Sequence, residues 1–218
     1  MLMNIFQIYM SFLNHPQAAG NKPFIGSSNL FNLLRGRSMS YRFKVPLDRV
    51  GVLIGKKGET LRLLQKRCNA RIEVDSESGE VVLYDDDAPD PYLTFRMRDV
   101  LRAVGRGFSP EHALKLLEDD MYYEEFDIRD FTGRSKKRII QVRSRVIGSG
   151  GKTRRLIEEL TDCMISIKGN TVALIGDIEG MKVASKAVTM ILNGSEHSSV
   201  YSYMEKKRRD LKVARWGF

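Results

Sequence analysis

Apolar and polar residues follow two periods along this chain, and the two periods recur in the same order in each half of the sequence. Alternation of apolar and polar residues predicts a β-strand, whereas apolar residues three or four positions apart predict a helix. In the first half we expect a strand at 41–45, helices at 46–54 and 59–67, strands at 70–74 and 81–84, and a helix at 91–104. This order, β-α-α-β-β-α, describes one small α+β domain.

The second half repeats this pattern at an offset of 93 residues. Without a gap, residues 54–62 fall on residues 147–155, and the Ile, Gly, Gly, Thr and Arg positions are identical. A repeated pattern of this kind usually means a repeated fold. We expect the second copy to begin near Phe126–Arg129, with a loop at 132–135 ahead of its first helix. Its later elements should be a helix at 152–160, strands at 163–167 and 171–175, and a helix from Asp177.

Two helices are expected outside the repeat. Ser109-Pro110-Glu111 is a good helix start with proline in the first turn, and the helix that it opens should bridge the two copies. A basic helix should run from Tyr201 to Arg215, either as a contact with a polyanionic partner or as a solvated charged face. The fold class is therefore α+β, with one domain and the linking helix at 40–120, a second domain at 121–195 and the basic helix within 196–218.

Residues 1–39 match nothing that follows. Met39 stands just before the first regular strand, so we expect either a flexible extension or the result of an upstream start. The opening 13 residues are apolar but too short and too polar to cross a bilayer, and no basic segment precedes them. We therefore expect no membrane segment.

The charge is high and unevenly distributed. The 218 residues carry a formal net charge of +9, and ten Lys or Arg lie between residues 129 and 155 against a single acid. Acidic residues gather instead at 85–90 and at 118–127. Such a balance favours a polyanionic partner, although a solvated basic surface would read the same way.

Cysteine and histidine give no sign of a metal or a cofactor. Cys68 and Cys163 are the only cysteines, and the three histidines are scattered without zinc-ligand spacing. We expect reduced thiols in the core and a cytoplasmic location. No arrangement of nucleophile and base is present, so we expect no enzyme.

The two conspicuous motifs are glycine turns between the first two helices of each copy. They are Gly55-Lys56-Lys57-Gly58 and Gly148-Ser149-Gly150-Gly151. A lone turn of this kind is usually a simple connector, but two at equivalent positions, each surrounded by bases, indicate a function. Glycine lets a phosphate approach the main chain, and the free N–H groups of the following helix favour anions.

This combination resembles the KH module in its type I arrangement, whose loop clamps the backbone of about four nucleotides while bases lie in an apolar groove. The resemblance implies RNA-binding residues Ile54, Gly55, Lys56, Lys57, Gly58, Arg62 and Ile72 in the first copy. In the second copy it implies Arg143, Arg145, Ile147, Gly148, Ser149, Gly150, Gly151, Lys152, Arg154, Arg155 and Ile165. Leu61, Val74 and Ile167 would complete the groove walls, although a strand residue such as Ile72 could equally be core. The second loop departs from the family pattern, because Ser149 and Gly150 replace two lysines.

Two rival motifs fail on particular residues. Gly151-Lys152-Thr153 ends like a nucleotide-binding P-loop, but that pattern requires glycine where Val146 stands. Arg106-Gly107-Phe108 begins like an RNA-recognition strand, but Ser109-Pro110 interrupts it and starts a helix instead.

From about Tyr41 to Leu211 the chain resembles the archaeal Dim-two (partner-of-Nob-one) and Krr family of ribosome-assembly proteins. Three segments carry the resemblance: residues 54–58 with 76–81, residues 105–114, and residues 153–161 running on to 197–201. It implies binding of small-subunit (pre-)rRNA near its 3′ end, beside a Nob-one-type endonuclease and small-subunit assembly intermediates. A KH subunit of an RNA-degradation complex and a protein-interaction scaffold remain alternatives.

Overall fold

A computed structural model describes residues 40–84 and 90–216, apart from the side chains of residues 91 and 209–216. The expectations for residues 1–39, and most of the acidic segment at 85–90, lie outside the described residues.

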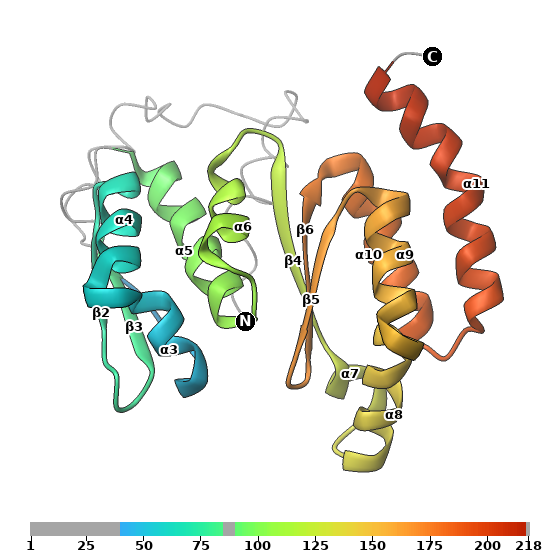
Figure 1. The fold of residues 1–218 in the computed structure, drawn as a ribbon, viewed down its shortest axis with the longest axis horizontal. Helices are drawn as coiled ribbons and strands as arrows, with labels where there is room; N and C mark the ends of the chain where they lie inside the picture. Colours follow the sequence, from blue (N-terminus) through green and yellow to red (C-terminus); the bar gives the residue numbers. More distant parts are fainter. Residues whose placement is uncertain (1–39, 85–89, 217–218) are drawn as a thin grey trace, which may run out of the picture. The chain divides into compact units, whose positions relative to one another are not determined.

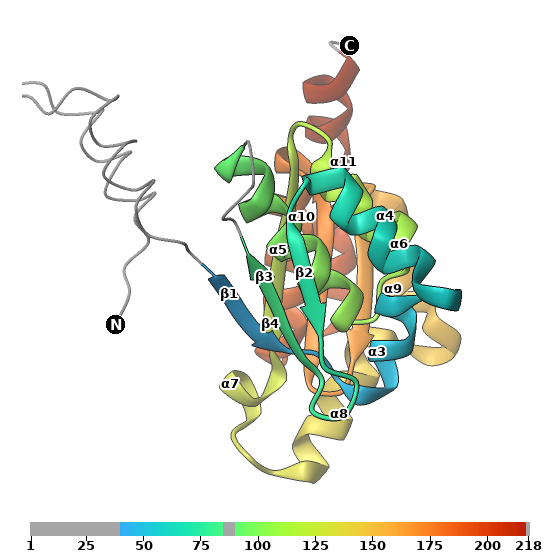
Figure 2. The same cartoon turned by 90° about the vertical axis from the view of Figure 1, so that its left-hand side faces the viewer.

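The first domain has the predicted order of elements (Figure 1). Its strands pair antiparallel in the order β1-β3-β2, so β1 and β2 are the two edges of the sheet (Figure 2). The elements are β1 (Ser40–Lys44), α3 (Leu47–Ile54), the short 3-10 helix η1 (Lys56–Gly58), α4 (Glu59–Cys68), β2 (Arg71–Val74), β3 (Glu80–Tyr84) and α5 (Pro91–Gly105). The predicted helical stripe on α5 is confirmed, because Met97, Val100, Leu101 and Val104 are fully buried.

The second domain repeats this topology, with strand order β4-β6-β5. The linking segment ahead of it consists of α6 (Pro110–Leu114) and η2 (Lys115–Leu117). The domain itself contains β4 (Met121–Asp127), α7 (Ile128–Thr132), α8 (Lys136–Ile147), η3 (Ser149–Gly151), α9 (Lys152–Thr161), β5 (Met164–Lys168), β6 (Thr171–Asp177) and α10 (Ile178–Leu192). The last helix is α11 (His197–Trp216).

The first strand of the second copy was expected near Phe126–Arg129, but it runs from Met121 to Asp127. Phe126–Arg129 are instead the end of β4 and the first turn of α7. Phe126 faces Val172 as Phe43 faces Val81, which is an offset of 83 residues, against 93 at the glycine loops. The second domain therefore has ten additional residues between its first strand and its glycine loop. These residues have no counterpart in the first domain, so the sequence repeat is interrupted there.

Two of the predicted helix starts are capped by a side chain, and a third helix begins earlier than predicted. The Ser109 side chain accepts a hydrogen bond from the His112 N–H at the start of α6, and Asp177 caps α10 by accepting one from Gly180. The last helix begins at His197, four residues before the predicted Tyr201.

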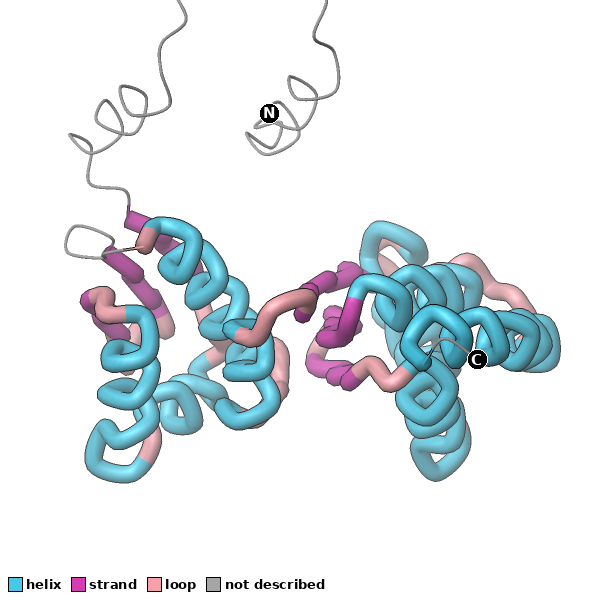
Figure 3. The backbone as a smooth tube through the Cα atoms, turned by 90° about the horizontal axis from the view of Figure 1, so that it is seen from above, coloured by secondary structure: helices cyan, strands magenta, loops and turns pink. Residues whose placement is uncertain are grey.

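The sheet of the second domain is covered on both faces. Val172 and Leu174 of β6 pack into the core of their own domain, whereas Ala173 and Ile175 belong to the core of the first. There they lie with Ala113 of α6 and Leu116 of η2 in one cluster. Figure 3 shows these strands between helices of both domains. The prediction that the linking helix bridges the copies is therefore confirmed.

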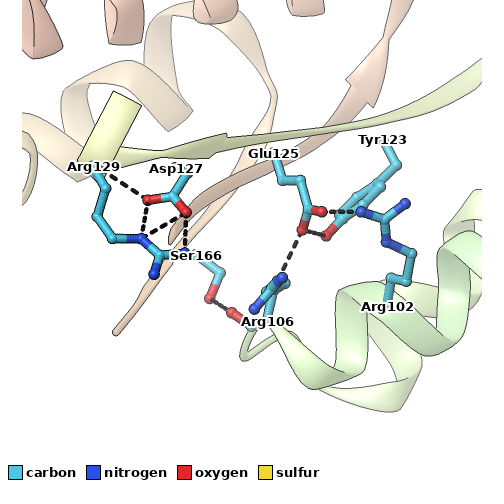
Figure 4. A network of polar contacts seen from close by, with 7 residues as sticks. All are labelled: Arg102, Arg106, Tyr123, Glu125, Asp127, Arg129 and Ser166. Carbon is cyan, nitrogen blue, oxygen red and sulfur yellow. Dashed lines mark hydrogen bonds and ion pairs between the residues drawn. The ribbon is translucent and has the colours of Figure 1, made fainter. Parts of the chain in front are cut away.

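A charged network lies beside this apolar contact (Figure 4). The Glu125 carboxylate of β4 accepts hydrogen bonds from Arg102, from Arg106 Nε at 2.9 Å and from the Tyr123 hydroxyl at 3.0 Å. Burial alone would raise the pKa of Glu125, but the two guanidinium groups outweigh it and hold that pKa below its ordinary value. Burial beside this carboxylate also raises the pKa of Tyr123, which therefore stays a donor.

The segment Arg106-Gly107-Phe108 forms a close contact between the domains. The Ser166 hydroxyl of β5 donates to the Arg106 carbonyl at 2.8 Å. A Cβ atom on Gly107 would lie 2.6 Å from that hydroxyl oxygen, so only glycine fits here. An ion pair between Asp48 of α3 and Lys168 of β5 adds a further contact.

Replacing Glu125 by Gln should destabilise the protein by roughly 1–2 kcal/mol at pH 7, because charged hydrogen bonds between the domains are lost. The folded pKa lies below the unfolded value of about 4.3, so this stabilisation is complete above that pH and disappears as the pH falls through the folded pKa. Urea unfolding measured between pH 3 and 7 should show that the free energy of unfolding falls less on acidification in Glu125→Gln than in wild type. Glu124 lies opposite Leu174 on the other face of the sheet. Glu124→Gln should therefore show the same dependence of unfolding free energy on pH as wild type.

Candidate nucleic-acid interface

The two glycine loops have the same backbone conformation although only their glycines agree in sequence. In each loop the first, third and fourth residues have positive φ angles. The φ angles are 74°, 51° and 77° at Gly55, Lys57 and Gly58, and 74°, 56° and 78° at Gly148, Gly150 and Gly151. The loop is thus one structural motif built twice.

The two glycines of a loop serve different purposes. A Cβ atom on Gly55 would lie 2.2 Å from Thr60 Oγ1 and 2.8 Å from the Thr60 nitrogen, because the loop folds closely over the next helix. At Gly58 the nearest such atoms are 3.7 Å away, so this glycine is needed for its left-handed conformation and leaves an open surface. Gly148 and Gly151 repeat the same distinction.

The helices that follow the loops have no side-chain caps. Neither α4 nor α9, each ten residues long, has one at its N-terminus. The first N–H of each helix donates within the preceding turn, from Glu59 to the Lys56 carbonyl and from Lys152 to the Ser149 carbonyl. The helix dipole still favours a phosphate there. Glu59 occupies the first turn of α4, whereas Lys152 occupies the same position in α9.

Basic side chains surround both loops. Lys56 and Lys57 are exposed, and the Arg62 guanidinium donates to the Lys57 carbonyl beside Gly58. Arg155 is placed equivalently, 3.6 Å from where a Cβ on Gly151 would lie. Residues 54–62 hold three bases and one acid, and residues 147–155 hold three bases and no acid, so the loss of two lysines does not make the second site less positive.

The predicted groove lies between the second helix and the edge strand of each domain. The Gln65 amide of α4 donates to the Ile72 carbonyl of β2 at 2.9 Å, and the Glu158 carboxylate of α9 accepts from the Ile165 N–H of β5 at 3.2 Å. The Ile72 and Ile165 side chains are buried in the cores, so neither side chain is presented to the groove. The two main-chain groups are occupied by these contacts with α4 and α9.

The remaining predicted wall residues differ in exposure. Ile54, Leu61, Val74, Ile147 and Ile167 are half-buried, as groove walls would be. Arg154 is exposed and lies 3.7 Å from the Glu158 carboxylate, so it borders the second groove as a partly paired cation.

Two predicted arginines are held by main-chain carbonyls. Arg143 donates to the Gly169 carbonyl at 3.2 Å, and the half-buried Arg145 donates to the Ser195 carbonyl. His197 Nε2 lies 2.9 Å from the Arg145 carbonyl in return. These contacts brace α8 against the rest of the domain, and a role in RNA contact remains a prediction for both residues.

The predicted helix between the loop at 132–135 and the second glycine loop is α8. It is twelve residues long against eight for α3, and its first residues Lys136, Lys137 and Arg138 are exposed. Sequence reasoning missed one feature of the second site. The hydrogen bond of 2.8 Å between Thr153 and the Tyr201 hydroxyl, which joins α11 to the loop region, had no signal in the sequence.

The described part of the chain contains no candidate metal site. No group of three or more His, Cys, Asp or Glu side chains within residues 40–84 and 90–216 could hold a metal ion. Both cysteines are buried thiols that form no disulfide with each other, and burial raises the pKa of the Cys68 thiol. None of the helices in these ranges has the length and apolar character needed to cross a membrane.

Two β-α-α-β-β-α units with this strand order, each with a glycine loop between its first helices, define a tandem type I KH protein. A family model described as a eukaryotic-type KH domain (type I) matches residues 122–209, and a KH domain model matches residues 40–88. KH domain-containing protein MJ0443 of Methanocaldococcus jannaschii is 42% identical over 173 residues, which cover 79% of this chain and 76% of the relative.

Solved structures agree with this assignment. Dim2p from Pyrococcus horikoshii matches with a TM-score of 0.70 and 40% identity, covering 77% of this chain and 99% of that chain. A chain in the a/eIF2α–aDim2p–rRNA complex from the same organism matches with a TM-score of 0.73 and 39% identity, covering 80% and 96%. A protein of unknown function from Aeropyrum pernix matches with a TM-score of 0.76 and 33% identity, covering 82% and 95%. The chain belongs to the archaeal Dim2 (Pno1-type) family of tandem KH proteins.

Gly55 is required for space and Gly58 for its backbone conformation, so replacing them by alanine should lower the free energy of unfolding by different amounts. Gly55→Ala should destabilise the protein by about 3 kcal/mol or more, because its Cβ would overlap Thr60. The Cβ of Gly58→Ala would make only an ordinary contact with the Arg62 side chain, 3.7 Å away, so this variant should cost only about 1–2 kcal/mol for the left-handed conformation. Urea unfolding of the two variants tests this order, and equal losses would contradict the loop geometry.

Proposed function

We propose that this protein binds small-subunit (pre-)rRNA, near its 3′ end, through the glycine loops of both KH domains and acts in ribosome assembly. The observation that carries the proposal is the repetition of one loop conformation in two divergent sequences, each time in front of an uncapped helix and among bases. The relative from P. horikoshii whose structure was solved in complex with rRNA supports the choice of ligand.

The charges around each loop suit a phosphate backbone in different ways. In the first domain, the ammonium groups of Lys56 and Lys57 lie on the loop itself. In the second, the loop carries no charged side chain, and the bases lie on α8 before it and on α9 after it. Phosphates could therefore follow α8 to the loop, which would extend the contact beyond the loop.

The protein would position RNA and not cut it, since no catalytic function is indicated for this KH family. A Nob-one-type endonuclease and small-subunit assembly intermediates are its proposed partners, and the cytoplasm its proposed location. The two buried thiols, which form no disulfide with each other, fit a reducing compartment.

The test is RNA binding by wild type and by two loop variants, Lys56→Asp/Lys57→Asp and Ser149→Asp/Gly150→Asp. Both should fold, because Lys57 already shows that the third loop position accepts a side chain, and a Cβ on Gly150 would meet nothing within 4 Å. Fluorescence anisotropy with 3′-end rRNA oligonucleotides should show at least about tenfold weaker binding in one or both variants, equivalent to about 1.4 kcal/mol.

Lys182→Asp/Lys186→Asp on α10 is the control for the first variant, because it makes the same charge change on exposed residues away from the loops. Folded loop variants that bind like wild type would make the loops structural connectors and favour a protein scaffold. Equal affinity for scrambled RNA would point instead to an RNA-degradation subunit with no rRNA preference, which co-sedimentation with small-subunit precursors would check.

A further inference from the structure

A cavity of about 310 Å³ opens at the β1 edge of the first sheet, whereas the glycine loop and groove lie toward the β2 edge. One wall is the edge strand and the two residues that follow it, and the other wall is the C-terminal half of α5 (Figure 2). The lining residues are Tyr41, Arg42, Phe43, Lys44, Val45, Pro46, Arg98, Arg102, Gly105 and Arg106. Half of them are Lys or Arg, and none is acidic.

Two of these five bases are uncommitted. Arg102 and Arg106 share the Glu125 carboxylate, and Arg98 donates to Asp99 at 2.9 Å and 3.1 Å. Arg42 and Lys44 are exposed and form no ion pair or side-chain hydrogen bond with another residue in the described ranges. Two further carboxylates lie on the side of Arg42 and Lys44, because Glu73 interacts electrostatically with Arg42 and Glu80 lies opposite Lys44 in the β1–β3 ladder. The five cations exceed the four carboxylates by one, so the site still attracts an anion.

Aromatic rings line this site and lie next to it. Tyr41 and Phe43 are lining residues. The Arg98 guanidinium lies 4.0 Å from the centroid of the Phe95 ring and 5.7 Å from that of Tyr41. The Phe95 side chain is 40% exposed. Exposed rings and guanidinium planes beside a cationic cavity are the elements on which nucleic-acid bases stack.

We propose that this cavity binds a phosphate and adjoining nucleotide of single-stranded RNA, as a third contact separate from the two glycine loops. Its volume falls in the range of small-molecule sites, and its charge matches a phosphate. An acidic peptide could use the same charges, but carboxylate side chains would not stack on the aromatic rings at the cavity. The choice of RNA rests on the proposed function, although the site itself does not.

The experiment uses the full chain carrying both pairs of loop substitutions described above, so that binding at the glycine loops is already weakened. On that background, Arg42→Glu/Lys44→Glu is compared with Lys182→Glu/Lys186→Glu, which makes the same charge change on α10. The probe is an unstructured twelve-nucleotide RNA, titrated by anisotropy over a salt series. Circular dichroism and urea unfolding verify that all variants fold.

The loop-substituted protein should retain weak, salt-dependent RNA binding. Arg42→Glu/Lys44→Glu should reduce that binding at least about tenfold and lower the salt slope by about 1.4, or 0.7 for each lost phosphate contact. The α10 control should change the affinity less than about threefold and leave the slope unchanged.

Three results would overturn the proposal: no residual binding after loop substitution, equal losses in the two charge-reversed variants, or tighter competition by a twelve-residue polyglutamate than by unlabelled RNA. The first two leave the glycine-loop function intact, because that function is measured with the loops present. Failure of wild type to bind rRNA selectively would instead reject the proposed function itself.

Discussion

The outer face of the second sheet is apolar, and the joining of the two domains depends on covering it. An antiparallel sheet can leave one face in water, but every residue of β6 from Thr171 to Gly176 is buried. Removing a side chain such as Ile175 from water is worth about 1.5–3 kcal/mol, and this face gains that only against α6 and η2 of the first domain. The first sheet differs, because Arg42, Arg71 and Glu73 of its edge strands remain exposed.

Polar contacts then fix how the apolar faces meet. Apolar packing alone tolerates sliding, whereas a carboxylate shared by two guanidinium groups and a phenol does not. The Glu125 network and the close contact of Gly107 with Ser166 lie on either side of Arg106, which takes part in both. The segment around residues 105–114 that marks the family in the sequence is therefore the joint between the domains. Its glycine is explained by packing, without any appeal to RNA.

The sequence was sufficient where structure is local and repeated. Both loops, the helices that flank them and the buried stripe on α5 follow from periodicity and glycine spacing. The beginning of β4 was missed for two reasons. An insertion after this strand shifts the repeat where no motif marks the shift, and apolar and polar residues do not alternate regularly from Tyr122 to Asp127. The roles of Glu125, Arg145 and Tyr201 could not be predicted, since each depends on a partner between 19 and 50 residues away that only packing brings near.

The two loops show how one backbone conformation can serve different electrostatics. In the first domain the positive charges are mobile ammonium groups on the loop, opposed by Glu59 at the helix start. In the second, Ser149, Gly150 and Gly151 leave the main chain bare, and Lys152 adds its charge to the helix dipole. Long lysine side chains attract a phosphate from a distance, whereas a helix dipole acts only close to the helix N-terminus. Under the proposed function, the first loop would therefore attract the RNA backbone by its charges, and the second would hold it at the start of α9.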